Sequence, residues 1–146
     1  MKVLFILEHY YPALGGVEKL FKSITEGLAK EGYEVTVLTL RSRRDLQKKE
    51  VYNGINIRRL HLLNRFFFTF FSFHYVLRYA RNSDIIHTTS YNAAFPAYFA
   101  ARLCRKKIII TFHEVWSKLW FRLPFLPLPL RTIFYLYESL ILKLKF

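Results

Sequence analysis

The chain has 146 residues, with 23 Lys and Arg against 10 Asp and Glu, a net charge of +13, and 18% aromatic residues. This length suits one domain. A single cysteine, Cys104, excludes an internal disulfide and favours a reduced, cytoplasmic setting. The apolar runs are too short for a secretory leader or a spanning helix, so we expect neither.

The excess of positive charge indicates an anionic partner. Aromatic side chains on a basic surface favour an anionic membrane over duplex DNA, because such rings suit the membrane interface. Single-stranded nucleic acid also stacks on aromatic residues, but no known nucleic-acid-binding module is present. We therefore predict an anionic membrane surface as a partner, with the protein peripheral on the inner face of the cytoplasmic membrane, and no nucleic acid.

The first stretch predicts a strand, a glycine loop and a helix. Residues 3–7 form a short apolar run typical of a buried strand, and Gly15 and Gly16 follow after a polar loop. A helical pattern then begins, with one apolar face expected from Val17, Leu20, Phe21, Ile24 and Leu28. Free backbone N–H groups at such a helix start favour an anion, although a plain tight turn has the same pattern.

The remaining elements alternate in the same way. Strands are predicted at 33–40, at 55–60 after a turn at Asn53–Gly54, at 83–87 and at 106–113, and helices at 64–81 and 92–105. Buried strands that alternate with helices predict an α/β fold: a Rossmann-like parallel sheet flanked by helices. Residues 1–115 would form this domain core.

Two aromatic segments stand apart from this pattern. The helix predicted over 64–81 has two apolar flanks, one with Phe66, Phe70, Phe73, Leu77 and Ala80 and the other with Phe68, Phe71, Tyr75 and Tyr79. One flank would cover the sheet, and the other needs a second helix, a further domain, a lipid surface or a partner protein. Residues 116–146 form a separate aromatic and basic loop with an amphipathic helix from 131, either packed on the sheet or membrane-interfacial.

Polar residues gather where the predicted strands end. They are Glu8, His9, Gly15, Gly16, His87, Thr88, His113 and Glu114. Ligands of parallel α/β sheets bind beyond the carboxyl ends of the strands, so we expect the paired glycines and the two strand-end histidines to share one cleft.

The same residues resemble a known family. The run from Leu14 to Glu18, the run from Leu28 to Thr39, the strand from Asp84 to His87, and the strand that ends in His113 and Glu114 are similar to the N-terminal domain of glycosyltransferase family 4. This resemblance implies the N-terminal half of a GT-B fold and retaining sugar transfer from a nucleotide-sugar donor, without a metal or another cofactor.

The resemblance also implies roles for individual residues. His113 would take the place of the active-site histidine that faces the reacting sugar. Gly15, Gly16 and Glu18 of the glycine motif would bind substrate, and so would His87, Thr88 and Glu114. Thr89 stands where many relatives have a second histidine, so that contact is missing.

The chain stops in a helix after the fifth predicted strand, and no donor-gripping domain follows. We therefore expect the acceptor-binding half of a glycosyltransferase, acting on a lipid-linked or membrane-near acceptor and inactive without a nucleotide-sugar-binding second domain or chain. The alternative is a non-catalytic module of a split enzyme that recruits a membrane or a partner. A dinucleotide-dependent enzyme is disfavoured, because the glycine spacing and an acidic residue after the second strand are missing.

Overall fold

A computed structural model describes all 146 residues. Its centre is a six-stranded sheet in the order β3-β4-β2-β1-β5-β6. The strands are β1 Lys2–Leu7, β2 Glu34–Leu40, β3 Lys49–Tyr52, β4 Ile55–Leu60, β5 Ile85–Thr89 and β6 Lys107–Thr111. The helices are α1 Gly16–Lys30, α2 Arg65–Phe71, α3 Phe73–Ala80, α4 Ala94–Cys104 and α5 Leu128–Lys143, with 3₁₀ turns η1 Tyr91–Ala93 and η2 Ser117–Arg122.

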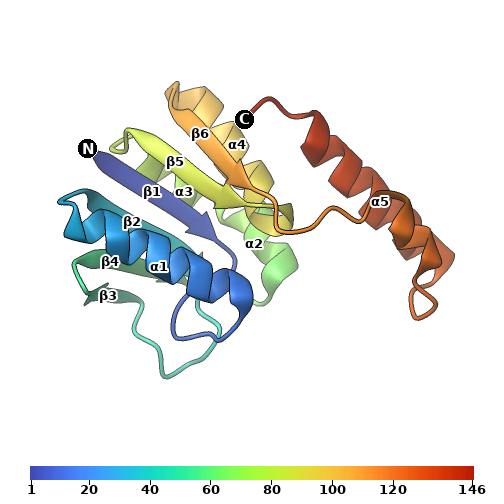
Figure 1. Cartoon of the computed structure of the whole chain (residues 1–146), viewed down its shortest axis with the longest axis horizontal. Helices are drawn as coiled ribbons and strands as arrows, with labels where there is room; N and C mark the ends of the chain where they lie inside the picture. The colour runs from blue at the N-terminus through green and yellow to red at the C-terminus, as the bar shows by residue number, and fades with distance from the viewer.

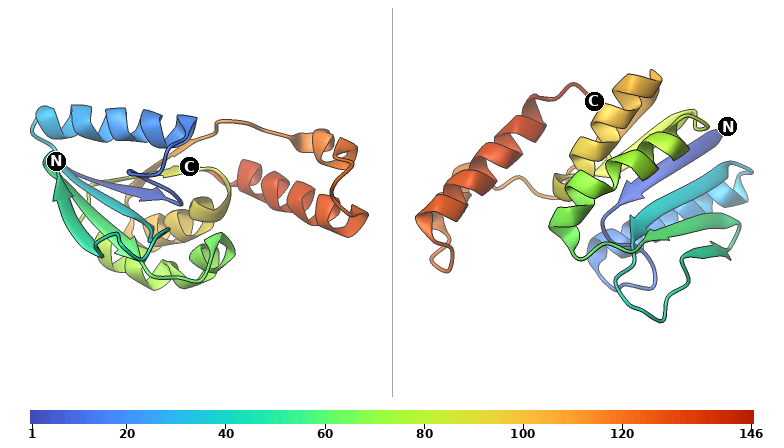
Figure 2. Two further views of the ribbon diagram at one scale, coloured as in Figure 1. Left: turned by 90° about the horizontal axis from the view of Figure 1, so that it is seen from below. Right: turned by 180° about the vertical axis from the view of Figure 1, so that it is seen from behind.

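Helices cover both faces of the sheet. Helix α1 lies on one face, and α2, α3 and α4 lie on the other (Figures 1 and 2). Side chains of β1 alternate between the two layers: Phe5 faces α1, whereas Leu4 and Ile6 face the other helices. All neighbouring strands except β3 pair in parallel. The predicted Rossmann-like parallel sheet flanked by helices is therefore confirmed.

The turn at Asn53–Gly54 is preceded by a strand that the sequence pattern missed. Both residues have positive φ, 48° and 79°, and they join β3 to β4 as an antiparallel hairpin. Strand β3 is short and lies at the edge of the sheet, so it lacks the apolar run of the central strands. The predicted turn and the strand that follows it are confirmed, whereas the strand before the turn was not predicted.

The helical stretch predicted over 64–81 is interrupted at Ser72, which divides it into α2 and α3. The division of its apolar residues into two flanks was also wrong, because Phe68, Val76 and Ala80 point into the core together. Helix α1 departs from its predicted face at one position, since Leu20 is exposed and Thr25 is buried instead.

The last thirty residues form an arm that projects beyond the carboxyl edge of the sheet (Figures 1 and 2). Its helix α5 packs against η2, with the rings of Trp120 and Phe134 5.1 Å apart. Glu138 is only 2% exposed and accepts hydrogen bonds from the backbone N–H groups of Trp116 and Ser117 and from the hydroxyl of Tyr91. This carboxylate ties the arm to the domain. No helix of the chain combines the length and the apolar character that crossing a bilayer requires.

Candidate functional site

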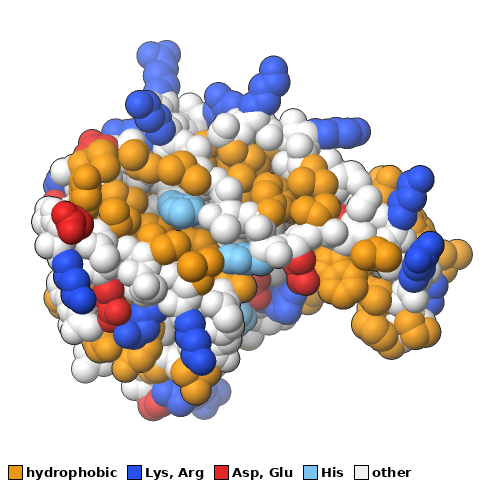
Figure 3. All heavy atoms as spheres, viewed as in Figure 1, with side chains coloured by type: hydrophobic (Ala, Val, Ile, Leu, Met, Phe, Trp, Pro, Cys, Tyr) orange, Lys and Arg blue, Asp and Glu red, His pale blue; other side chains and the backbone are white.

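A hollow of about 190 Å³ lies at the carboxyl ends of β1, β5 and β6, beside the start of α1 and of α2. Its walls are Leu7, Glu8, His9, Val17, Glu18, Arg65, Thr89, Ser90, Tyr91, His113 and Glu114. On the face that carries α1, histidine side chains lie near the centre, whereas most Lys and Arg side chains project at the periphery (Figure 3). The hollow therefore combines acids, bases and hydroxyl groups in a protein that is otherwise strongly basic.

The first half of the loop after β1 is held by several hydrogen bonds. At its start, the backbone carbonyl of Glu8 accepts hydrogen bonds from the backbone N–H of Leu40 and the hydroxyl of Thr39, both 3.2 Å long. Further along, the buried guanidinium of Arg59 donates to the carbonyl oxygen of Tyr11 over 3.0 Å. Tyr10 packs into the core, where its hydroxyl is hydrogen-bonded to that of Thr25 at 2.7 Å. These contacts keep the polar side chains of the loop at the rim of the sheet.

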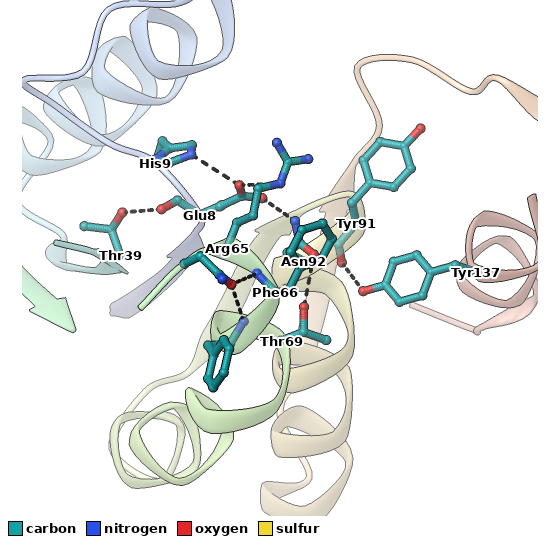
Figure 4. Close-up of polar contacts among 11 residues, drawn as sticks. Glu8, His9, Thr39, Arg65, Phe66, Thr69, Tyr91, Asn92 and Tyr137 are labelled. Carbon is teal, nitrogen blue, oxygen red and sulfur yellow. Dashed lines mark hydrogen bonds and ion pairs between the residues drawn. The ribbon is translucent and has the colours of Figure 1, made fainter. Parts of the chain in front are cut away.

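The Glu8 carboxylate is the centre of a polar network (Figure 4). It accepts a 2.7 Å hydrogen bond from Nδ2 of Asn92, and it lies 3.2 Å from Nε2 of His9 and 3.4 Å from Nε of Arg65. The hydroxyl of Thr69, on α2, donates to Oδ1 of Asn92 over 3.1 Å. The network therefore joins the end of β1 to η1 and α2, which are distant in sequence.

The network sets the charges at the rim. Burial by itself would raise the pKa of the Glu8 carboxyl, but hydrogen bonds from His9 and Asn92 and the charge of Arg65 hold this pKa below its ordinary value of 4.5. The hydrogen bond to Glu8 raises the pKa of His9 above 6.5. Burial lowers the pKa of His87, which favours its neutral form. The rim thus pairs an ionised Glu8 with a His9 that is easily protonated.

Three of the predicted site residues meet at the hollow. His113 and Glu114 follow β6 and are exposed, and Glu18 projects from the first turn of α1. The His113 ring stands edge-on to Phe21 of α1, with 5.8 Å between ring centres. These side chains come from opposite ends of the domain sequence and lie together because parallel strands end at one edge.

The other four predicted residues do not line the hollow. His87 packs between Phe5 and Phe21 beneath α1, with Nε2 2.8 Å from the hydroxyl oxygen of Thr111. Thr88 is buried and donates to the carbonyl oxygen of Ile6.

Gly15 is the N-cap of α1 and Gly16 is its first residue, and neither lines the hollow. The Glu18 carboxylate occupies the space that a Cβ on Gly15 would fill. The absence of a side chain at Gly15 thus admits Glu18, and the expected common cleft forms with His113 but without the glycines and His87.

Sequence reasoning missed two members of the site. Arg65 was expected only as part of the helix over 64–81, yet it begins α2 and its side chain, 59% exposed, borders the hollow. Asn92 was placed at the start of a helix, but it is 5% exposed and binds Glu8. The Asn64 N-cap, which accepts from the backbone N–H groups of Phe66 and Phe67, was an available signal that a helix starts at Arg65.

No group of three or more His, Cys, Asp or Glu side chains has an arrangement suited to a metal ion. The hollow is instead lined by carboxylates, imidazoles and one guanidinium. Together these groups can both donate hydrogen bonds to hydroxyl groups and accept hydrogen bonds from them.

Comparisons with known proteins agree on the class of fold. The family model described as Glycosyltransferase Family 4 matches residues 14–144. Among solved structures, the chain is similar to sucrose-phosphate synthase from Thermosynechococcus elongatus, with a TM-score of 0.69 and 15% identity over 98% of this chain and 40% of that one. The chain thus spans less than half the length of that structure. No curated protein matches it in sequence.

Proposed function

Because the chain belongs to glycosyltransferase family 4, we propose that it is the acceptor-binding half of a retaining, nucleotide-sugar-dependent glycosyltransferase. Its sheet is the Rossmann-like half of a GT-B fold. The proposed acceptor is a sugar carried by a lipid or held near a membrane, and the proposed location is the inner face of the cytoplasmic membrane. The donor is a substrate, and no cofactor is proposed.

The hollow at the carboxyl rim is the observation that carries this proposal. Glu8, Glu18 and Glu114 place three carboxylates around it, and these disfavour a phosphate group but accept hydrogen bonds from sugar hydroxyls. Arg65 and the histidines supply donors. A ligand rich in hydroxyl groups therefore suits the hollow better than an anion does.

His113 is the residue that we propose to face the reacting sugar. It is exposed at the hollow, and Phe21 supports one side of its ring. A neutral imidazole hydrogen-bonds a sugar hydroxyl, and a protonated one stabilises negative charge on a departing phosphate. Glu18 and Glu114 would orient acceptor hydroxyls, whereas His87 and Thr88 would support the site from within the sheet.

The proposal divides the reaction between two domains or chains. This chain would supply the acceptor side, and a nucleotide-sugar-binding domain or chain would supply the donor side. We therefore expect the isolated chain to bind acceptor sugars without transferring a donor sugar to them.

Saturation-transfer NMR with a panel of methyl hexopyranosides, followed by incubation with nucleotide sugars, tests both parts. We expect millimolar binding of at least one glycoside, a loss of this signal in His113→Ala and in Glu18→Gln, and an unchanged signal in the control Lys30→Gln. The absence of binding, or equal binding by all variants, would refute the acceptor site. Turnover by the isolated chain would refute the division of labour.

A second candidate function is a non-catalytic module that recruits a membrane or a partner chain. The observation that favours it is the edge strand β6, which pairs only with β5 and leaves Ile109 48% exposed. An unpaired edge of this kind offers main-chain groups to another chain. Vesicle binding without any glycoside binding would favour this function over the first.

A further inference from the structure

Helix α2 has two faces with different surroundings. Phe68 and Thr69 point inward, where Thr69 supports Asn92 and thereby Glu8 at the hollow. Phe66, Phe67, Phe70 and Phe71 point outward and are 38–75% exposed. The rings of Phe67 and Phe71 stack 5.3 Å apart. We define these four outward phenylalanines as the aromatic ridge.

The ridge continues into a cationic surface on α3. Phe66, Phe70, His74 and Arg78 are spaced four residues apart, and all four are exposed. Ser72, between α2 and α3, keeps a helical backbone with φ −74° and ψ −21°, so these side chains follow one another in a strip that turns slowly around the helical stretch. His74, Arg78 and Arg81 border a second hollow of about 250 Å³, and neither arginine forms an ion pair. Phe70 and Arg78 are eight residues apart, which corresponds to about 12 Å along a helix.

The charge of this surface favours an anionic lipid membrane over a second copy of the chain as its binding partner. Residues 64–82 contain no Asp or Glu, and the whole chain carries +13. A second copy of the same chain would bring like charges together at this surface, which opposes association. An anionic lipid surface is complementary to it, because rings of this kind enter the headgroup region while arginines attract anionic lipids.

From this arrangement we propose that the aromatic ridge of α2 and the cations His74, Arg78 and Arg81 of α3 form a docking surface for anionic lipid membranes. Arg65, the first residue of α2, borders the sugar hollow, and Phe66 begins the ridge at the next position. The docked membrane therefore lies beside the hollow. The biological role of this surface rests on the proposed function, because a membrane docked here would bring lipid-linked acceptors next to the hollow.

Co-sedimentation of the full chain with vesicles tests the surface. The vesicles contain phosphatidylcholine alone or phosphatidylcholine mixed with phosphatidylglycerol, each at low and at high salt. We expect binding to the anionic vesicles that weakens at high salt, because screening reduces the attraction between arginines and lipid phosphates. Neither sugar nor nucleotide is present, so this result and that of the glycoside experiment can fail independently.

Matched variants locate the binding surface. We expect Phe70→Ser with Phe71→Ser to lower the partition coefficient on the order of tenfold or more. We expect Arg78→Gln with Arg81→Gln to lower it by a similar factor at low salt. The control variants lie on α1, on the opposite face of the sheet. Leu20→Ser replaces an exposed apolar side chain by serine, as the phenylalanine variants do. Lys19→Gln with Lys30→Gln removes two positive charges, as the arginine variants do.

Circular dichroism and thermal unfolding establish that each variant is folded, and all the changes are at exposed positions. Three outcomes overturn the proposal: no vesicle binding, equal binding to neutral and anionic vesicles, or equal loss in the α1 controls. A concentration-dependent dimer that Phe70→Ser and Phe71→Ser abolish, without vesicle binding, would assign the surface to a second copy instead.

Discussion

Replacing Asn92 with Asp tests the polar network with a change of one atom. Oδ1 would still accept from the hydroxyl of Thr69, but an oxygen would replace the Nδ2 group that donates to Glu8 over 2.7 Å. At neutral pH two carboxylates would then face each other in a site where Asn92 is 5% exposed. The loss of one hydrogen bond to a charged group costs about 1.5–3 kcal/mol, and the repulsion adds to it.

We therefore expect Asn92→Asp to lower the free energy of unfolding by about 3 kcal/mol at pH 7. For a domain of this size each kcal/mol lowers Tm by about 2–4 °C, so the expected decrease is roughly 6–12 °C. The difference from the native chain should shrink towards pH 4, because a protonated Asp can again donate to Glu8.

Denaturant unfolding at several pH values measures this effect. Asn82→Asp is the matched control, because Asn82 is exposed and the same charge is introduced away from Glu8. If Asn92→Asp were as stable as the control at pH 7, or if its deficit did not change with pH, the amide of Asn92 would not hold the Glu8 carboxylate as described.

Two further predictions concern the rim and the arm. Glu8→Gln should lower the pKa of His9, measured by NMR titration of the imidazole, because Glu8 is the main cause of its raised value. The ion pair of Glu8 with protonated His9 stabilises the fold fully below pH 6.5, and this stabilisation is lost as the pH rises through the raised pKa of His9. The difference in free energy of unfolding between the native chain and Glu8→Gln should therefore shrink above that pKa. A difference that grows with pH would contradict the pairing. Glu138→Ala should speed chymotrypsin cleavage near Trp120 at least several-fold and lower stability by about 3 kcal/mol, because three donors lose the buried carboxylate that accepts from them; unchanged cleavage would show that Glu138 does not anchor the arm.

The hollow carries charges of both signs, whereas the exposed side chains of α2 and α3 carry positive charge alone. Carboxylates around the hollow accept hydrogen bonds from hydroxyl groups, whereas the arginines of α3 attract phosphates to the neighbouring surface. A lipid-linked sugar contains both kinds of group. Arg65 borders the hollow and Phe66 begins the ridge at the next position, which suits a ligand with its sugar in the hollow and its phosphate towards the membrane.

The sequence by itself determined the class of fold and the edge at which the site forms. The apolar run 3–7 is buried on both faces of the sheet, a pattern typical of the central strands of a parallel sheet covered by helices. Parallel strands place their carboxyl ends at one edge, so Glu8 after β1 and His113 after β6 meet without any local signal between them. The resemblance carried by the glycine motif led to the same family that the comparison found.

Only the tertiary structure decided which side chains face the hollow. His87 is in register with Phe5 on the α1 face of the sheet, so α1 covers it and removes it from the rim. Asn92 and Arg65 come from segments read as parts of helices, and they join Glu8 because α2 and η1 pack beside each other at the end of β1. Sequence periodicity shows which residues share a side of an element, but the neighbour that packs on that side determines whether a polar residue becomes buried, supports the site or contacts a ligand.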